Sequence, residues 1–312
     1  MAGQVWQTDA LGGYMYADNL SRKLRTALQP MVRFRQFCDV KEAFGTGKGE
    51  FFNWDVYLDV ADQGGEILET ETMPETNFTI VQATLTVTEF GNSVPFTKKL
   101  DDLSEHPVTE IIHKVLKNDA RKALDTAAYA QFDNCLLRVT PTSGNDTQAL
   151  DLNVDGTAPG TNNIAFGNLH AKSVADIMAE REIPTFDGQN YFGIGRPTTF
   201  RDFKDDLESI HQYVSEGWHV VMNGEKGRYE GIRFVEQTNV ASQGWSNGLS
   251  DEIFFFGADT VAEAFSIPEE IRGKIPSDYG RSRGVAWYAL LGYGIVHTEA
   301  SQSRIVKWDS DA

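Results

Sequence analysis

The chain has 312 residues and a mass of 34.7 kDa, enough for two domains and a large core without disulfide or metal support. Hydrophobic residues make up 41 % and charged residues 23 %, the composition of an ordinary folded chain. The 45 acidic residues outnumber the 28 basic ones and give a formal net charge of −17, which argues against general binding to nucleic acid or to anionic membranes.

Membrane, secretory and zinc-binding signals are absent from the sequence. No apolar run approaches the roughly 18 residues of a transmembrane helix, and the first residues lack the basic and apolar regions of a signal peptide. We therefore expect neither. The two cysteines, Cys38 and Cys135, have no CxxC partner, so we expect buried, reduced thiols of a protein made in a cytoplasm and no structural zinc site.

The N-terminal part of the chain predicts an arm followed by a long hairpin. Residues 1–30 hold scattered aromatic residues and a short amphipathic stretch that ends at Pro30. Residues 51–60 and 78–90 each alternate apolar and polar side chains, which is the period of a strand with one wetter face. An acidic segment with Gly and Pro separates them, so we expect a hairpin with a broad end.

The predicted hairpin has an unusual charge. No Lys or Arg occurs from Gly49 to Thr97, whereas nine acidic residues fall in this range. One interpretation is a solvated acidic loop. The other is a protruding arm that docks on a basic surface of another subunit, where complementary charge sets register and partner choice.

The strongest predicted element is a helix over about 107–134. Pro107 suits the first helical position, and apolar residues then recur at spacings of three and four. The apolar stripe begins with large residues and ends with alanines, so we expect the closest packing in the C-terminal half. Six charged residues are expected on the opposite, polar side: Lys114, Lys117, Asp119, Arg121, Lys122 and Asp125.

The remaining sequence predicts a mixture of helices and strands. Residues 140–168 suggest a loop or weak hairpin, and residues 169–182 a second amphipathic helix. A turn, a short buried strand and a Pro-started helix are expected within 183–203. Further strands are expected at 228–240, 252–257, 285–296 and 303–308.

No motif in the chain predicts catalysis. The sequence FGTGKG at 44–49 lacks the Ser or Thr and the following helix of a phosphate loop, so its glycines predict a hinge. There is no GxSxG motif and no HExxH or HxH pair, and acids this abundant identify no carboxylate pair. We therefore expect no enzyme activity, no metal site and no cofactor.

The order of the segments carries a resemblance to a known family. An arm, a long acidic hairpin, a lead-in, one very long helix, a mixed domain and a late strand resemble the major capsid protein of tailed bacterial viruses, the HK97-type fold. Within that group the chain resembles the family that includes the capsid protein of phage N4. The resemblance rests on EFGNSVPFTKKLDDL (89–103), IPTFDGQNYFGIGRPTTFRDFKDD (183–206), GRYEGIRFVEQTNV (227–240) and RGVAWYALLGYGIVHTE (283–299), within a match over most of residues 30–308.

The resemblance implies an α+β fold with named parts. These are an N-terminal arm at 1–30 and an extended β-hairpin loop at 51–90 that lies over a neighbouring subunit. A peripheral domain is made of 31–50, 91–165 and 281–297, with a spine helix at about 107–134. An axial domain is made of 166–280 and 298–312.

The resemblance also implies partners and a location. Copies of the chain are expected to self-assemble into the pentamers and hexamers of an icosahedral shell. The shell encloses double-stranded DNA without sequence-specific binding. We expect a portal protein, a possible decoration protein and no membrane partner. The protein is expected in the virion, after synthesis in the bacterial host cytoplasm.

Two departures from the family pattern qualify these expectations. Some members carry a scaffolding-like segment before the arm, whereas this chain starts at the arm, so we expect a cleaved segment or a separate scaffolding protein. Some members join subunits by a Lys–Asn isopeptide link. The hairpin has no Lys beyond Lys48 at its base, and residues 248–312 contain no Asn, so we expect no covalent cross-link.

The charge pattern names candidate residues for the contact between subunits. The acids of the hairpin tip would pair with basic residues outside the hairpin in an adjacent chain. The acidic candidates are Glu66, Glu69, Glu71 and Glu75, and the basic candidates are Lys98, Lys99, Lys114, Lys117, Arg121, Lys122, Arg281 and Arg283.

Two other functions stay open at this stage. An encapsulin-type nanocompartment uses the same fold to enclose a cargo enzyme. A hydrolase or sugar-binding domain with an acidic cleft belongs to a different class. Formation of particles would exclude the hydrolase or sugar-binding domain. The DNA content of the particles would then separate a virus from an encapsulin.

Overall fold

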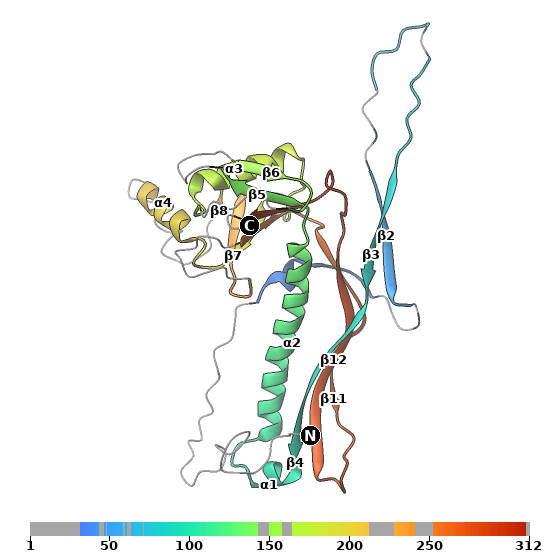
Figure 1. Cartoon of the computed structure of the whole chain (residues 1–312). Coiled ribbons are helices and arrows are strands. Elements are labelled where there is room, and N and C mark those ends of the chain that lie inside the picture. The colour runs from blue at the N-terminus through green and yellow to red at the C-terminus, as the bar shows by residue number, and fades with distance from the viewer. Residues whose placement is uncertain are drawn as a thin grey trace.

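Helix α2 (Val108–Asp133) runs beside one sheet and reaches a second sheet with its C-terminal turn (Figure 1). The computed structural model describes residues 32–43, 47, 49–58, 60, 64–70, 72–142, 150–157, 164–211, 228–240 and 252–309. The expected N-terminal arm at 1–30 lies outside the described residues. A short 3-10 helix, Phe34–Phe37, begins the described chain and packs against α2.

The first sheet has four strands in the order β1-β11-β12-β4. The pair β1–β11 is parallel and the other pairs are antiparallel. Helix α1 (Lys98–Leu103) follows β4 directly, because the Thr97 hydroxyl accepts a hydrogen bond from the Leu100 N–H and caps the new helix. The strands are β1 (Asp39–Ala43), β4 (Thr88–Thr97), β11 (Val261–Gly273) and β12 (Ser282–Ile295).

The second sheet has seven strands in the order β6-β5-β13-β10-β7-β9-β8. Helix α3 (Asn168–Glu180) packs on one face of this sheet, and so does the start of α4 (Arg201–His211). The strands are β5 (Leu137–Pro141), β6 (Leu150–Asn153), β7 (Tyr191–Gly195), β8 (Arg228–Tyr229), β9 (Ile232–Glu236), β10 (Glu252–Phe256) and β13 (Ile305–Asp309).

Strand β10 is buried on both faces, as its unbroken apolar sequence predicts. Ile253 and Phe255 join the core beneath α3 and α4. Phe254 and Phe256 point to the other face and join the core formed with α2. The two cores therefore meet at this central strand, and α2 is fixed to the second sheet through it.

The structure confirms the predicted long helix almost to the residue. Pro107 is the N-cap residue and not the first helical residue, a difference of one position. Two parts of the predicted stripe were wrong. Val115, whose spacing places it on the predicted apolar stripe, is 53 % exposed, whereas Asp125, expected on the polar side, is buried. Asp125 can be buried because three groups from distant parts of the chain donate hydrogen bonds to it.

Sheet membership differs from the expected domain boundaries in two places. Strands β5 and β6 fall within 91–165, which was expected in the peripheral domain, yet they pair in the seven-stranded sheet. Strand β11 falls within 166–280, expected in the axial domain, yet it pairs with β1 and β12. The boundaries of the peripheral and axial domains stay a prediction. Pairing with β13 and β12, which come late in the chain, decides the membership of these strands.

Candidate assembly interface

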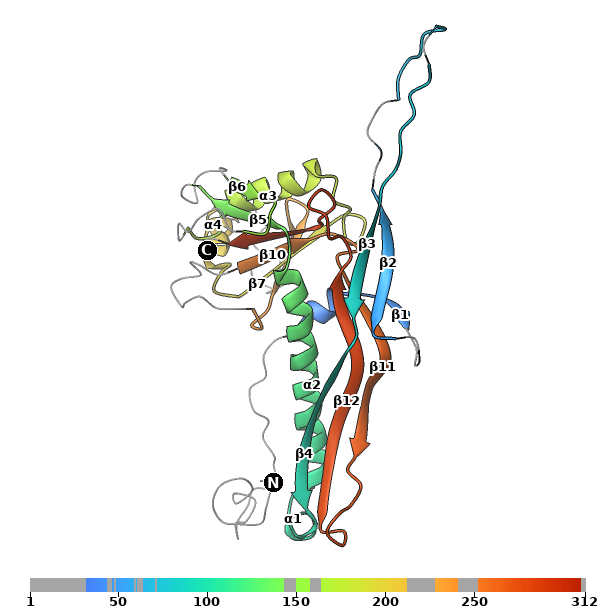
Figure 2. The ribbon, with the colours of Figure 1, turned by 45° about the vertical axis from the view of Figure 1, so that its right-hand side comes forward.

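A two-stranded ribbon projects from the first sheet, away from α1 and the lower end of α2 (Figure 2). It consists of β2 (Phe51–Tyr57), β3 (Ile80–Thr86) and the described residues between them. A ribbon of two strands is marginally stable alone in water. Eight of the fourteen exposed large apolar side chains of the described residues lie on it: Phe51, Tyr57, Val60, Ile67, Leu68, Met73, Phe78 and Ile80.

The ribbon has one face toward the molecule and one toward solvent. Register pairs Tyr57 with Ile80, and both side chains are exposed on the outer face, by 80 % and 55 %. Leu85 and Ala83 lie on the inner face and are buried. Several exposed large apolar side chains on one projection are typical of a protein contact site.

Glycines in β12 fix the root of the ribbon. A Cβ atom at Gly292 would lie 2.3 Å from the Thr86 carbonyl oxygen, and one at Gly294 would lie 3.1 Å from Leu85 Cβ. The ribbon can therefore cross β12 this closely because Gly292 lacks a side chain, whereas a Cβ at Gly294 would be a tight contact. The Trp54 indole donates a hydrogen bond to the Val296 carbonyl at 3.3 Å and completes the attachment.

The acidic tip predicted from the sequence is exposed where it is described. Glu66, Glu69 and Glu75 lie on the segment between β2 and β3, and each is exposed. Glu71 lies outside the described residues. A contact of these carboxylates with an adjacent copy stays a prediction.

The predicted basic residues come from α1, α2 and the beginning of β12. Lys98 and Lys99 start α1, at the end of the molecule opposite the ribbon tip (Figure 1). Three of the others already have partners in their own chain. Lys114 pairs with Glu110 at 2.7 Å, Arg281 with Asp278 at 3.7 Å and Arg283 with Asp101 at 3.5 Å.

Lys117, Arg121 and Lys122 are exposed on α2 and have no ion pair within the described part of the chain. Lys117 and Arg121 line a groove of about 410 Å³ between α2 and strand β11, whereas Lys122 does not. Ile271, which is 61 % exposed, contributes apolar surface to the groove, whereas Trp287, which also lines it, is buried. Periodicity of the helix suggested the basic face, but the apolar surface beside it comes from strands more than a hundred residues later.

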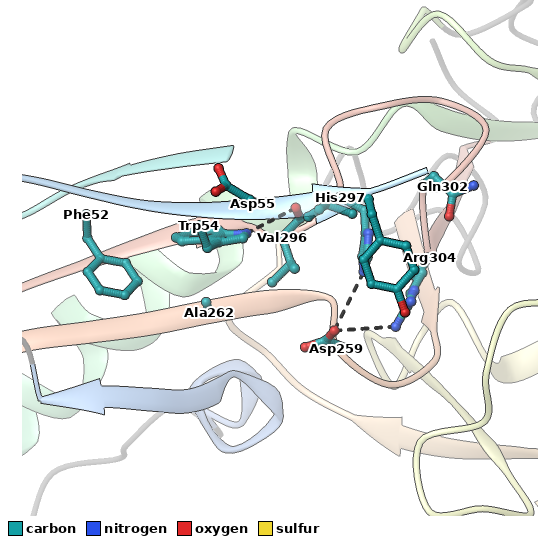
Figure 3. Close-up of a pocket in the computed structure, with 11 residues that line it drawn as sticks. Phe52, Trp54, Asp55, Asp259, Ala262, Val296, His297, Gln302 and Arg304 are labelled. Carbon is teal, nitrogen blue, oxygen red and sulfur yellow. Dashed lines mark hydrogen bonds and ion pairs between the residues drawn. The ribbon is translucent and has the colours of Figure 1, made fainter. Parts of the chain in front are cut away.

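A second hollow, of about 490 Å³, lies beside the ribbon root (Figure 3). Phe52 and Trp54 of the ribbon face it, with Asp259, His297 and Arg304 on the other side. Asp259 lies 3.7 Å from His297 Nε2 and 3.6 Å from the Arg304 guanidinium. No Ser, Thr, Cys or Lys is among the described residues that line the hollow.

Buried charged side chains lie where the first sheet, α2 and the second sheet pack together. The Arg35 guanidinium pairs with buried Glu263 at 2.6 Å and also with Glu269. Asp125 accepts hydrogen bonds from the Arg35 backbone N–H and from Gln237 Nε2, at 3.2 and 2.7 Å. Burial raises the pKa of Asp125, and these hydrogen bonds offset the effect only in part.

The structure confirms that the two cysteines are buried. Cys38 and Cys135 are both buried, and burial raises the pKa of Cys135 to about 12. No group of three His, Cys, Asp or Glu side chains among the described residues could hold a metal ion. No described helix is both long and apolar enough to cross a membrane.

Solved structures with the same arrangement are chains of phage capsids. The chain superposes on the capsid of cyanophage P-SCSP1u with a TM-score of 0.67 at 10 % identity, over 98 % of this chain and 96 % of that one. The capsid of cyanophage Pam1 superposes with a TM-score of 0.66 at 13 % identity, over 98 % of this chain and 100 % of that one. The capsid of Helicobacter pylori bacteriophage KHP30 superposes with a TM-score of 0.67 at 11 % identity, over the whole length of both chains. No family model and no curated protein matches the sequence.

These matches cover nearly the whole length of both partners, so they include the ribbon, α2 and both sheets. Identities of 10–13 % show a shared fold. The expected α+β class is confirmed: the chain has the HK97-type fold of phage capsid chains.

Proposed function

We propose that the chain is the major capsid protein of a tailed bacteriophage, a structural protein whose function resides in contacts between copies. The observation that carries the proposal is the ribbon, which holds eight of the fourteen exposed large apolar side chains of the described residues. A monomer gains nothing from such a surface on a thin projection, whereas a shell of many copies buries it. The fold shared with phage capsid chains supports the same conclusion.

The finer parts of the proposal rest on the segment order. The chain would belong to the N4-like group and form pentamers and hexamers of an icosahedral shell in the virion, after synthesis in the bacterial cytoplasm. A scaffolding protein and a portal protein would assist, and a decoration protein would be a further partner. The net charge of −17 suits a container whose acidic surfaces do not grip packaged double-stranded DNA.

Imaging of the purified chain tests this proposal. Negative-stain electron microscopy should show closed shells tens of nanometres wide, and sedimentation should show a species of many copies. Shells that hold a cargo enzyme and no DNA in the native host would support an encapsulin-type compartment. A stable monomer at all concentrations and salt conditions would contradict a shell function and favour the acidic-cleft reading.

A further inference from the structure

Asp125 is a buried acid that has no cation beside it. The residue is 2 % exposed, and within the described part of the chain it forms no ion pair. Three neutral groups donate hydrogen bonds to its carboxylate: the Arg35 backbone N–H at 3.2 Å, Gln237 Nε2 at 2.7 Å and Asn239 Nδ2 at 2.9 Å. A buried carboxylate without a cation is costly in free energy, so burial raises the pKa of Asp125.

The side-chain amide of Gln237 is the nearest of these donors and is only half satisfied. Gln237 is fully buried, and its Oε1 has no hydrogen-bond partner in the described chain. A half turn of the amide would therefore break no hydrogen bond at Oε1, and it would place this oxygen where Nε2 now lies, 2.7 Å from Asp125 Oδ2. The amide can thus donate to an ionised Asp125 or accept from a protonated one.

The Asp125–Gln237 pair joins two parts of the fold. Asp125 lies on α2, which packs along the first sheet. Gln237 directly follows β9, and its backbone N–H donates to the Gly195 carbonyl at the end of β7 at 2.9 Å. This backbone bond fixes Gln237 to the second sheet, so the strength of the side-chain pair affects how firmly α2 is held to that sheet.

The other ionisable groups beside this joint are held by partners or by burial. They are Arg35, Cys38, Glu263, Glu269 and Tyr293. The guanidinium pairs with both glutamates. Burial raises the pKa of the cysteine thiol and of the tyrosine hydroxyl, so both stay neutral below pH 7. Asp125 is therefore the one acid of this group without a cation to hold its charge.

We infer that Asp125 and Gln237 form a proton-operated lock between α2 and the second sheet. When the acid is ionised, the joint contains a buried charge that only neutral donors offset. When the acid is protonated, the charge is gone and the carboxyl O–H donates to the rotated amide, so the joint tightens as pH falls from 7 toward about 4. The lock belongs to the single subunit, so it goes beyond the proposed shell function.

Hydrogen exchange of the full chain as free subunits tests the lock. After correction for the intrinsic effect of pH on exchange, the amides of Arg35 and Gln237 should be more protected at pH 5 than at pH 7, by about tenfold for each unit that folding adds to the pKa of Asp125. Asp125→Asn has no proton to bind, so protection of the same amides should not change with pH. Ribbon amides of β2 and β3 lie away from the joint and serve as the internal control.

The exchange data have two outcomes that would overturn the inference. One is equal protection of the joint amides at both pH values in the parent. The other is the same pH-dependent change in Asp125→Asn, because the proton would then bind elsewhere. Asparagine keeps the shape of aspartate, so this test does not depend on a disruptive substitution.

An exchange of the two side chains tests the pairing. Gln237→Glu puts two carboxylates in one site, where they can hold only one proton between them, so this variant should unfold at lower urea at pH 7 and recover at pH 5. Adding Asp125→Asn restores one amide and one carboxylate and should recover most of the loss at pH 7. Gln189→Glu makes the same charge change at an exposed position and should unfold like the parent.

A double variant that is no more stable at pH 7 than Gln237→Glu would show that the two side chains do not act as a pair. Particle formation is not a readout of either test. Failure of the lock therefore leaves the shell function standing, and failure of the unmodified chain to assemble leaves the lock standing.

Discussion

The ammonium group of Lys307 lies 2.6 Å from a carboxylate oxygen of Glu252, and both side chains are buried between the second sheet and α2. Asp133, the last residue of α2, lies 2.6 Å from the same nitrogen. Tyr129, one turn earlier in the helix, donates its hydroxyl to the other Glu252 oxygen at 3.0 Å. This network ties the end of α2 to the central strands of the second sheet.

Replacing Lys307 should destabilise the fold strongly. Lys307→Met leaves Glu252 buried without its cation, and removal of one partner of a buried pair costs about 3–5 kcal/mol. The free energy of unfolding in urea measures the change. Lys204→Met is the control, since its pair with Glu236 is half-exposed and should contribute about 1 kcal/mol or less. Equal effects of the two substitutions would contradict the assigned role of the network.

Asp125 should make the stability of the protein depend on pH in the acid range. Its pKa is raised by burial, so the folded state binds the proton more tightly than the unfolded state does. The contribution of protonated Asp125 is therefore fully present below the unfolded pKa of about 4 and is lost as pH rises through the folded pKa. Relative to Asp125→Asn, the parent should gain stability as pH falls from 7 toward 4. Parallel curves of unfolding free energy against pH would show that Asp125 titrates normally.

The root of the ribbon should not tolerate a side chain on β12. Gly292→Ala places a Cβ against the Thr86 carbonyl, which belongs to the backbone and cannot rotate away. We expect a loss of about 1–3 kcal/mol in unfolding free energy and a displaced ribbon, visible as a change in Trp54 environment. Gly273→Ala is the control, because open space surrounds that position in β11. A Gly292→Ala protein that matches this control would refute the crossing.

The spacing of apolar residues was sufficient to predict the elements whose burial it determines. The helix over 108–133 and the buried strand over 252–256 follow directly from apolar spacing. Strand β11 was not predicted, because Pro268 and two irregularities between Phe265 and Glu270 break the alternation of apolar and polar residues. The burial of Asp125 was also not predictable, since Gln237 and Asn239, which bond to it, lie over a hundred residues away.

The candidate interface was predictable in part. The lack of any Lys or Arg from Gly49 to Thr97 identified the ribbon as acidic. The sequence did not separate Lys117 and Arg121 from the other basic residues, because that choice depends on the groove formed with β11. The need for glycine at position 292 was likewise not predictable, because it arises from the crossing of β3 over β12 in the folded chain.

Charge reversal at the tip should weaken assembly. Replacing Glu66, Glu69, Glu71 and Glu75 by Lys removes the attraction to a basic partner surface. Each exposed pair contributes only about 0–1 kcal/mol, but the contact repeats in every copy of a shell. We expect a lower particle yield, and we expect assembly of the parent to weaken as salt rises. Particles of the reversed variant with unchanged yield and salt tolerance would mean that the tip makes no charge-dependent contact.

Hydrogen exchange of the ribbon amides in free subunits and in assembled particles tests the central claim most directly. Residues 64–70 and 72–79 should exchange fast in the free subunit and slowly in the particle, because a neighbouring copy covers them only after assembly. Amides of the buried face of α2, such as those at Leu116 and Leu124, should be protected equally in both states. Equal protection of the ribbon before and after assembly would contradict the conclusion that this surface exists to contact another copy.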